Sequence, residues 1–195
     1  MSDWVILITG TPRVGKTTVA RLLSSRLNAL YVNLTDLALR EDLVLGKDEK
    51  RDSVIVDEDL MRAKLREIIR NRDLSPVVVD GHYAFSVVPK DLVTHVFVLR
   101  RNPVELRKFM EESGFSGDKL WENLACEILD VCLSEVLDFY DREEVCELNV
   151  TGKDMEEIGS QILDILEGVK KCPVSEVDWL IELENEGLLQ EYLRI

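Results

Sequence analysis

The segment from Gly10 to Thr18 has the residue types and spacing of a phosphate-binding loop. It reads GTPRVGKTT and follows a short apolar run. Gly10 and Gly15 permit backbone angles that aim N–H groups at phosphate oxygens, and the helix expected next adds its positive N-terminal end. In this pattern Lys16 should reach the β- and γ-phosphates, Thr17 should ligate Mg²⁺, and Thr18 should contact the α-phosphate. The loop predicts a bound nucleotide, but a kinase, a hydrolase and a switch can all carry it.

A second candidate site lies in VVVDGH, residues 77–82. Asp80 is expected at the carboxyl end of a buried strand, where ligands bind in α/β folds, and its carboxylate could hold Mg²⁺ directly or through water. The alternative is an acid that caps a helix or a turn. His82 could lie near the γ-phosphate, where neutral imidazole can orient water or an acceptor; otherwise it is a packed or capping histidine. His95 begins an expected strand and is interpreted as structural.

Apolar, β-branched runs predict the elements that position these residues. Five of them are expected to be strands: 4–9, 30–34, 76–80, 95–99 and 146–150. Because they do not alternate with polar residues, they are typical of a parallel sheet covered on both faces. Helical patterns separate them: one after the loop, one over about 57–70, a long one over about 118–140, and one from Met155 to Leu166. Strand–helix alternation of this kind predicts a three-layer α/β fold with five parallel strands.

The composition limits the classes of partner. The chain has 195 residues and a net charge of -14, which disfavours strong binding to nucleic acid or anionic lipid because such binding relies on clustered Lys and Arg. The charge would suit a basic protein partner, or it serves solubility alone. No apolar stretch approaches a membrane span and no signal peptide is visible, so a cytoplasmic protein is expected.

The four cysteines, Cys126, Cys132, Cys146 and Cys172, form no C-x-x-C pair, and the chain has two histidines. A zinc site or a disulfide framework is therefore not expected. Reduced, mostly buried thiols are the prediction.

A boundary is expected near residues 170–173, so that a domain over 1–170 precedes a helical extension over 171–195. The extension is acidic and carries one or two short amphipathic patterns. We expect Trp179, Leu180 and Leu183 to pack back on the core; the alternative is a docking element for a partner.

Several segments together resemble one family. They are GTPRVGKTT, the stretch 36–59, DGHYAF at 80–85, the stretch 98–128 and TGKDMEE at 151–157. These segments are similar to adenylate kinase 6 and its archaeal relatives, over about residues 4 to 168. The resemblance implies a P-loop nucleoside monophosphate kinase fold, ATP–AMP phosphotransfer, ATP hydrolysis, and a role in small ribosomal subunit maturation with a basic ribosomal protein as partner. It places a monophosphate-binding lobe near 33–56 and a lid near 108–121.

The resemblance also assigns roles to residues. Asp80 and His82 would form a modified Walker B motif, and Lys16 would be catalytic with them. Thr17 and Asp80 would hold Mg²⁺. The ATP-binding residues would be Gly10, Arg13, Val14, Gly15, Lys16, Thr17, Thr18, Arg107, Lys108, Gly152 and Lys153. The monophosphate-binding residues would be Asp36, Arg40, Arg51, Asp57, His82 and Tyr83.

The chain departs from the usual kinases of this fold where arginines are expected. Leu39, Phe109 and Ser113 stand at positions where those kinases carry arginine. Basic residues that remain near them are Arg13, Arg51, Arg100, Arg101, Arg107, Lys108 and Lys119. Losing a transition-state arginine costs on the order of a thousandfold in rate or more, so these departures put efficient AMP phosphorylation in doubt. Hydrolysis needs only the loop, Mg²⁺ and a positioned water.

Two further questions stay open at this stage. Lys119, Asn123 and Glu127 are spaced by four residues and share one helix face, which either meets the nucleotide pocket or is solvated. A small-metabolite kinase, for example for shikimate or a sugar acid, would share the loop and the length.

Overall fold

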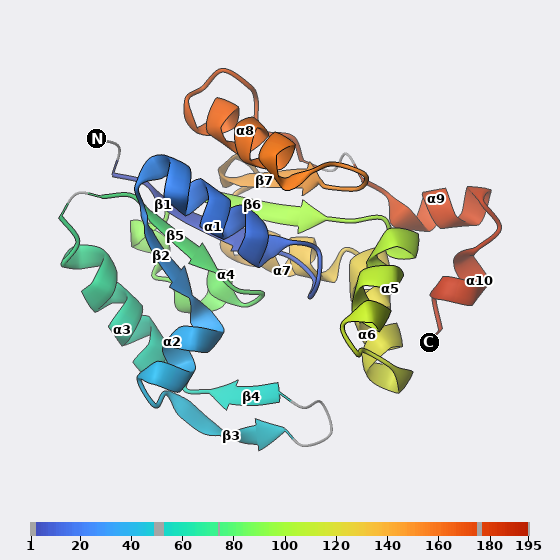
Figure 1. Ribbon diagram of the computed structural model, residues 1–195, viewed down its shortest axis with the longest axis horizontal. Helices are drawn as coiled ribbons and strands as arrows, with labels where there is room; N and C mark the ends of the chain where they lie inside the picture. The colour runs from blue at the N-terminus through green and yellow to red at the C-terminus, as the bar shows by residue number, and fades with distance from the viewer. Residues whose placement is uncertain (1–2, 49–52, 74, 175–176, 195) are drawn as a thin grey trace.

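A five-stranded parallel sheet forms the centre of the protein. The computed structural model describes residues 3–48, 53–73, 75–174 and 177–194 (Figure 1). The sheet order is β2-β5-β1-β6-β7, and every pair is parallel. The strands are β1 (Val5–Thr9), β2 (Leu30–Asn33), β5 (Val77–Asp80), β6 (His95–Arg100) and β7 (Val145–Asn149). The predicted fold class is confirmed, and each predicted strand end lies within one residue of the observed one.

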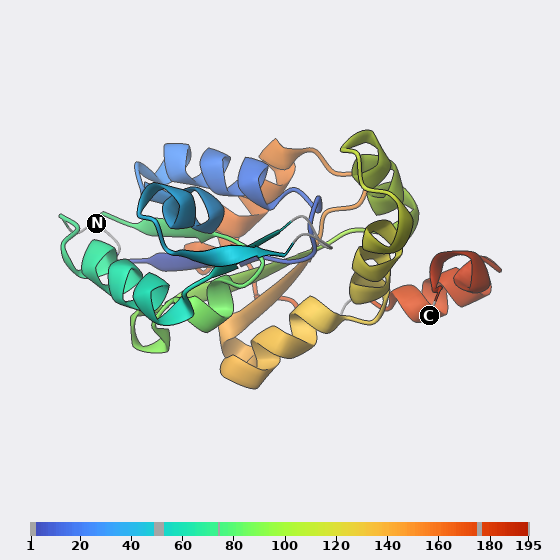
Figure 2. The same ribbon diagram turned by 90° about the horizontal axis from the view of Figure 1, so that it is seen from below.

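Helices cover both faces of this sheet. On one face lie α1 (Lys16–Leu27) and α8 (Met155–Leu166); on the other lie α3 (Glu58–Arg70), the short α4 (Ala84–Val87) and α7 (Val131–Phe139) (Figure 2). Successive residues of β1 alternate between the two cores, since Ile6 and Ile8 face α1 while Val5 and Leu7 face α3. Both sets are fully buried, so the strand reads as a continuous apolar run.

The segment between β2 and β5 contains an additional small sheet. After α2 (Leu34–Arg40), β3 (Val44–Asp48) and β4 (Ser53–Val56) pair antiparallel, with a register irregularity between Val44 and Gly46. The sequence predicts a lobe here but not its hairpin. Two short apolar runs, 43–45 and 54–56, separated by a charged stretch of sequence, were the signal that could have found it.

The long helix predicted over 118–140 is wrong. The chain forms α6 (Gly117–Ile128) and α7 instead, with Asp130 between them in the left-handed region at φ 56°. The Asp130 carboxylate accepts from the guanidinium of Arg100, at the end of β6. A tertiary contact therefore interrupts a segment whose apolar spacing is continuous. The remaining elements are α5 (Pro103–Glu112) and two 3₁₀ turns, Lys90–Leu92 and Arg142–Glu144.

The C-terminal extension packs on the core, as expected from its apolar residues. It forms α9 (Trp179–Asn185) and α10 (Leu189–Tyr192), which lie beyond α5 and α6 in Figure 1. Trp179 and Leu183 are buried, and the half-buried Leu180 packs against the same cluster. Within the described residues, no helix is long and apolar enough to cross a membrane.

The prediction that all cysteines are free is wrong for one pair. Cys146 in β7 and Cys172 form a disulfide. The chain after α8 returns along β7, where the Glu147 N–H donates to the Pro173 carbonyl at 2.7 Å. This return of the chain brings the two sulfurs together, and the spacing of the cysteines in the sequence does not predict it. Cys126 and Cys132 are not part of this disulfide, and burial raises the pKa of Cys132 to about 11.

Candidate nucleotide-binding site

The phosphate loop joins β1 to α1 through backbone that requires glycine. Gly10 has φ 130° and Gly15 has φ 113°. A Cβ on Gly10 would lie 2.4 Å from the Leu99 carbonyl oxygen of the neighbouring strand β6. Only glycine therefore fits where the loop leaves the sheet. Arg13, at the tip, also has a positive φ of 70°, and its guanidinium lies 5.8 Å from the centre of the Phe115 ring.

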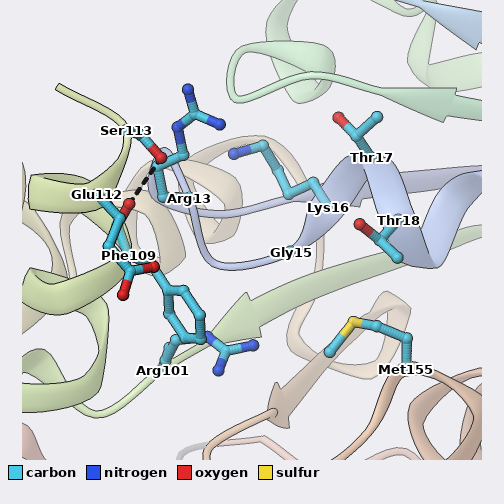
Figure 3. Close-up of a pocket in the computed structure, with 10 residues that line it drawn as sticks. All are labelled: Arg13, Gly15, Lys16, Thr17, Thr18, Arg101, Phe109, Glu112, Ser113 and Met155. Carbon is cyan, nitrogen blue, oxygen red and sulfur yellow. Dashed lines mark hydrogen bonds between the residues drawn. The ribbon is translucent and has the colours of Figure 1, made fainter. Parts of the chain in front are cut away.

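A cavity of about 440 Å³, here called the loop cavity, lies beside this loop. Figure 3 shows its lining, with loop residues on one side and residues from the end of α5 on another. The lining residues are Arg13, Gly15, Lys16, Thr17, Thr18, Arg101, Phe109, Glu112, Ser113 and Met155. The loop residues Arg13, Gly15, Lys16, Thr17 and Thr18 thus line one cavity, whereas Gly10 and Val14 do not. Arg101, which directly follows β6, adds a guanidinium.

Lys16 is held against the loop by two backbone carbonyls. Its ammonium group donates to Gly10 O at 2.8 Å and to Thr11 O at 2.9 Å. Burial lowers the pKa of Lys16 below its ordinary value, and the carboxylate of Asp80 partly opposes this shift. The cation is thus positioned at the mouth of a loop whose N–H groups favour anions.

Asp80 lies next to the loop because of the strand order. It ends β5, which pairs with both β1 and β2, and its register partners are Ile8 and Asn33. Its Oδ2 accepts hydrogen bonds from Thr17 Oγ1 at 2.7 Å, Asn33 Nδ2 at 2.9 Å and Tyr31 Oη at 3.0 Å. The sequence analysis did not identify Tyr31 or Asn33, since only the parallel pairing of β2 with β5 brings them here.

The Thr17–Asp80 pair fits a magnesium ion. A hydroxyl and a carboxylate in contact beside a phosphate loop are oxygen donors, which this hard cation prefers. The described residues contain no group of three or more His, Cys, Asp or Glu that could hold a metal. Mg²⁺ is commonly held by one or two carboxylates together with substrate phosphates, so this small donor set suits it.

His82 lies between the loop and a second cavity. Partial burial, which disfavours the charged imidazolium, lowers the pKa of His82 to about 4. The charge of Lys16 adds to this shift and the charge of Asp80 opposes it, and part of the side chain is exposed to solvent. The imidazole is therefore neutral near pH 7. Its backbone carbonyl accepts from Thr9 Oγ1 at 3.0 Å, and its ring meets Tyr83 edge-on at 4.9 Å.

This second cavity, here called the lobe cavity, has a volume of about 520 Å³. It is lined by Thr35, Ala38, Val54, Ile55, Val56, Glu58, His82 and Tyr83, so strand β4 and helix α2 form much of its wall. Of the residues predicted to bind a monophosphate, His82 and Tyr83 lie here. Thr35, Ala38 and Glu58 were not predicted as binding residues, because the sequence does not specify which faces of α2 and α3 meet β4.

The other predicted lobe residues lie elsewhere. Asp36 and Arg40 line a different depression beside β2, and Arg40 pairs with Glu41. Asp57 caps α3, since its Oδ1 accepts from the Leu60 N–H at 3.0 Å. Arg51 lies outside the described residues.

Several predicted nucleotide contacts also lie away from the loop cavity. Arg107 pairs with Glu111 and with Glu191 of α10, each at 2.9 Å, and Lys108 is exposed. Gly152 donates its N–H to the Glu105 carboxylate at 3.0 Å. Neither Gly152 nor Lys153 lines the cavity, whereas Met155, which starts α8, does.

The remaining basic candidates separate into distinct roles. Arg100 is buried and bonded to Glu127, Glu147 and Asp130, so it is structural. The Lys119 ammonium lies 5.1 Å from the centre of the Phe115 ring. Arg101 Nε and Nη2 donate to Val14 O at 3.3 and 3.1 Å, and its guanidinium lies 4.8 Å from the centre of the Phe109 ring. Arg101 is thus the guanidinium that both touches the loop backbone and lines its cavity.

Comparisons with known proteins agree with this geometry. The family model described as "AAA domain" matches residues 6–130. A protein named "Putative adenylate kinase" from Pyrococcus furiosus is 39% identical over 191 residues, covering 98% of both chains. One of the same name from Methanococcus maripaludis is 34% identical over 90% of this chain and 95% of its own. Shikimate kinase from Bacteroides thetaiotaomicron shares the fold, with a TM-score of 0.53 at 17% identity, covering 84% of this chain and 98% of its own.

The α/β sheet and its phosphate loop thus define a P-loop protein with the fold of small kinases. The chain belongs to the AAA-domain family, and it belongs to the same family as these relatives, which are named putative adenylate kinases.

Proposed function

We propose that the protein transfers the γ-phosphoryl group of Mg²⁺-ATP to a nucleoside monophosphate, with AMP as the acceptor, to give two molecules of ADP. The observation that carries this proposal is the pair of adjacent cavities. The loop cavity includes Lys16 and Thr17, and the lobe cavity includes His82, whose pKa is lowered in part by the Lys16 charge. Two nucleotides bound there would bring a γ-phosphate and an acceptor phosphate together.

The chemistry asked of the protein is positioning and charge neutralisation. A monophosphate acceptor is already an anion, so no strong general base is needed. Lys16 and Arg101 bring positive charge to the loop cavity, and the loop N–H groups bind phosphate oxygens. Mg²⁺, held by Thr17 and Asp80, supplies further neutralisation of phosphate charge when bound. Neutral His82 can hydrogen-bond an acceptor oxygen or a water without adding charge.

ATP hydrolysis is the second candidate activity, and the lining of the lobe cavity favours it. No Lys or Arg is among the described residues of that lining, and Glu58 is one of them. An acceptor phosphate bound there needs a cation from elsewhere. Hydrolysis needs only a water, which His82 is suitably placed to orient.

A partner protein is compatible with either activity. The net charge of -14 suits a basic protein, and the resemblance to adenylate kinase 6 implies a basic ribosomal protein during small-subunit maturation. Nucleotide would then shift the protein between states that bind this partner with different affinity. Affinity capture of the purified basic protein, with and without ATP, tests this role; no capture in either case argues against it.

Coupled assays separate the two activities. ADP production is measured with Mg²⁺-ATP alone, then with AMP, CMP, GMP or UMP added, and with shikimate and gluconate as metabolite controls. We expect a basal rate from hydrolysis and an additional rate with AMP. Failure of every monophosphate to raise ADP production, at any concentration, would sink the kinase proposal and leave the hydrolase. A rate increase with shikimate or gluconate alone would indicate a metabolite kinase.

A further inference from the structure

Glu127, near the end of α6, connects three separate parts of the chain. Its side chain is 1% exposed. Its Oε1 accepts from Arg100 Nε at 2.9 Å, from the Arg101 N–H at 3.0 Å and from Trp179 Nε1 at 3.0 Å. Its Oε2 accepts from Thr11 Oγ1 at 2.5 Å. One buried carboxylate therefore contacts the phosphate loop, the end of β6 and the C-terminal helix α9.

Two of these contacts lead directly to the loop cavity. Thr11 follows the glycine that begins the phosphate loop, and its carbonyl accepts from the Lys16 ammonium at 2.9 Å. Thr11 therefore contacts Glu127 through its side chain and Lys16 through its backbone carbonyl. Arg101 lines the cavity and donates to the Val14 carbonyl. Glu127 thus fixes the backbone on both sides of the phosphate site without touching it.

Glu127 is paired with a buried cation, Arg100, which also contacts two other carboxylates. Arg100, also 1% exposed, donates to the Glu127 carboxylate and its carbonyl, to Glu147 at 2.7 Å, and to Asp130. A buried carboxylate needs both a cation and hydrogen-bond donors, and here it has both. Its neutral donors are the Arg101 N–H, Thr11 Oγ1 and Trp179 Nε1, and the last two are side-chain groups that a substitution can remove.

The contact from Trp179 is supported by the rest of the extension. Trp179 is 1% exposed. Farther along, Glu182 accepts from Asn102 Nδ2 at 2.7 Å, and Glu191 accepts from Arg107 Nη1 at 2.9 Å. These contacts hold α9 and α10 against α5, so the indole N–H is directed at Glu127 by a docked element.

We propose that Glu127 is a positioning residue for the phosphate loop, and that Trp179 holds it in place. The C-terminal extension is then part of the nucleotide-binding machinery, although it lies outside the loop cavity. This inference rests on the proposed function, because the ligand concerned is Mg²⁺-ATP.

Two conservative substitutions test the link. Trp179→Phe removes the indole donor and keeps an aromatic ring, and Thr11→Val removes the hydroxyl and keeps the shape. Each is expected to weaken Mg²⁺-ATP binding about five- to tenfold by calorimetry, since each removes a hydrogen bond to a charged group. Because both act through Glu127, the double variant should bind no more weakly than about either single one. Thr11→Ser, which keeps the hydroxyl, should bind as the wild type does.

Trp4→Phe is the matched control. It makes the same chemical change at the start of β1, where Trp4 meets His95 edge-on and not Glu127, and its affinity should be unchanged. The chain has three tryptophans, so the variant Trp4→Phe/Trp121→Phe retains Trp179 alone. We expect its emission to change on addition of Mg²⁺-ATP and to saturate at the calorimetric Kd.

The outcomes separate this inference from the proposed function. Wild-type protein that binds no Mg²⁺-ATP overturns both. Wild-type binding with unchanged affinity in Trp179→Phe and Thr11→Val, or with additive losses in the double variant, overturns the inference alone. If the fluorescence emission of Trp179 does not change when Mg²⁺-ATP is added, the proposed role of Trp179 is also overturned. If Trp179→Phe fails to fold, Thr11→Val and its rescue by Thr11→Ser still decide the link to Glu127.

Discussion

The loop cavity and the lobe cavity are built in different ways. The loop cavity is formed around one continuous segment, Gly10–Thr18, and it contains the basic groups of Arg13, Lys16 and Arg101. The lobe cavity is assembled from α2, strand β4, the start of α3 and the turn after β5, and its described lining contains Glu58 but no basic residue. Three basic residues and one acid, Glu112, thus line the loop cavity, whereas the described lining of the lobe cavity has an acid and no basic residue.

The difference between the two cavities can be compared at the positions where kinases of this fold usually carry arginine. The positions that read Phe109 and Ser113 do line the loop cavity. The Phe109 ring lies 4.8 Å from the Arg101 guanidinium, a cation–π distance. Phe109, at a position where those kinases usually carry arginine, thus packs against Arg101, which directly follows β6. No equivalent replacement is found in the described part of the lobe cavity.

The largest effect is expected at the loop. Lys16→Ala should lower turnover of ATP on the order of a thousandfold or more, because a cation at the transferred phosphate is lost. The side chain is half-buried at the surface, so the circular dichroism spectrum and the unfolding midpoint should stay close to those of the wild type. Steady-state ADP production checks the rate; a loss below tenfold would contradict the assignment of the loop cavity to ATP.

Substitution of His82 tests whether this residue acts on bound ATP from the lobe cavity. His82→Ala should lower hydrolysis of bound ATP about a hundredfold, a typical contribution of a positioned proton-transfer or orienting group. The Kd for ATP should change little, because His82 lines the lobe cavity and not the loop cavity. Single-turnover rates and calorimetry separate the two quantities. Weaker ATP binding with an unchanged single-turnover rate would show that the proposed role is wrong.

Substitutions of two arginines, one in the lining of the loop cavity and one outside it, compare the cavity with its surroundings. Arg101→Ala should lower kcat/KM for ATP about thirtyfold, since a charge-assisted contact is lost from the cavity lining. Arg107→Ala is the matched variant: Arg107 pairs with Glu111 and Glu191 outside the lining, so its effect should be within about threefold. Equal losses in the two variants would mean that the lining does not identify the nucleotide contacts.

Adding a basic residue to the lobe cavity tests whether the acceptor phosphate binds there. Thr35 is an exposed residue of the lobe-cavity lining. Thr35→Arg introduces a cation there and should lower the KM for AMP about tenfold, by a charge-assisted hydrogen bond to phosphate. The hydrolysis rate without AMP is the control and should stay unchanged. If the KM for AMP stays the same or rises, the lobe cavity is not where the acceptor phosphate binds.

The smallest effect concerns stability at acidic pH. The pKa of His82 is lowered from 6.5 to about 4 in the folded protein. As the pH falls through 6.5 toward 4, the unfolded chain takes up a proton that folded His82 does not, so the free energy of unfolding decreases. His82→Gln should show a smaller decrease over that interval. Urea unfolding of both proteins near pH 7 and near pH 4.5 measures the difference; parallel profiles would contradict the shift.

Residues close together in the sequence were predicted well. The strands, the phosphate loop and Asp80 each follow from a local pattern of apolar residues and glycine, and the order of parallel strands then brings Asp80 beside Thr17. The candidates farther from the loop were predicted less well. Asp36, Arg40 and Asp57 lie near the lobe in sequence, but they line another depression or cap a helix.

Glu127 shows most clearly which features could not be predicted from the sequence. Its spacing from Lys119 and Asn123 indicated a shared helix face, which left open whether that face was solvated. The structure places Asn123 against the Lys119 carbonyl, with its Nδ2 at 2.6 Å, while Glu127 is buried against Thr11 and Trp179. A spacing of four residues places side chains on one face, but burial depends on which elements pack on that face.

By itself, the sequence determined the class of fold and the phosphate loop, because backbone conformation and strand burial depend on residues within a few positions of each other. Only the tertiary structure decided the break at Asp130, the Cys146–Cys172 bond, the lining of the lobe cavity and the contacts of Glu127. Each of these joins residues far apart in the chain, through buried charges or hydrogen bonds that form only once the sheet is assembled. Their partners depend on how whole elements pack, and no local pattern specifies that.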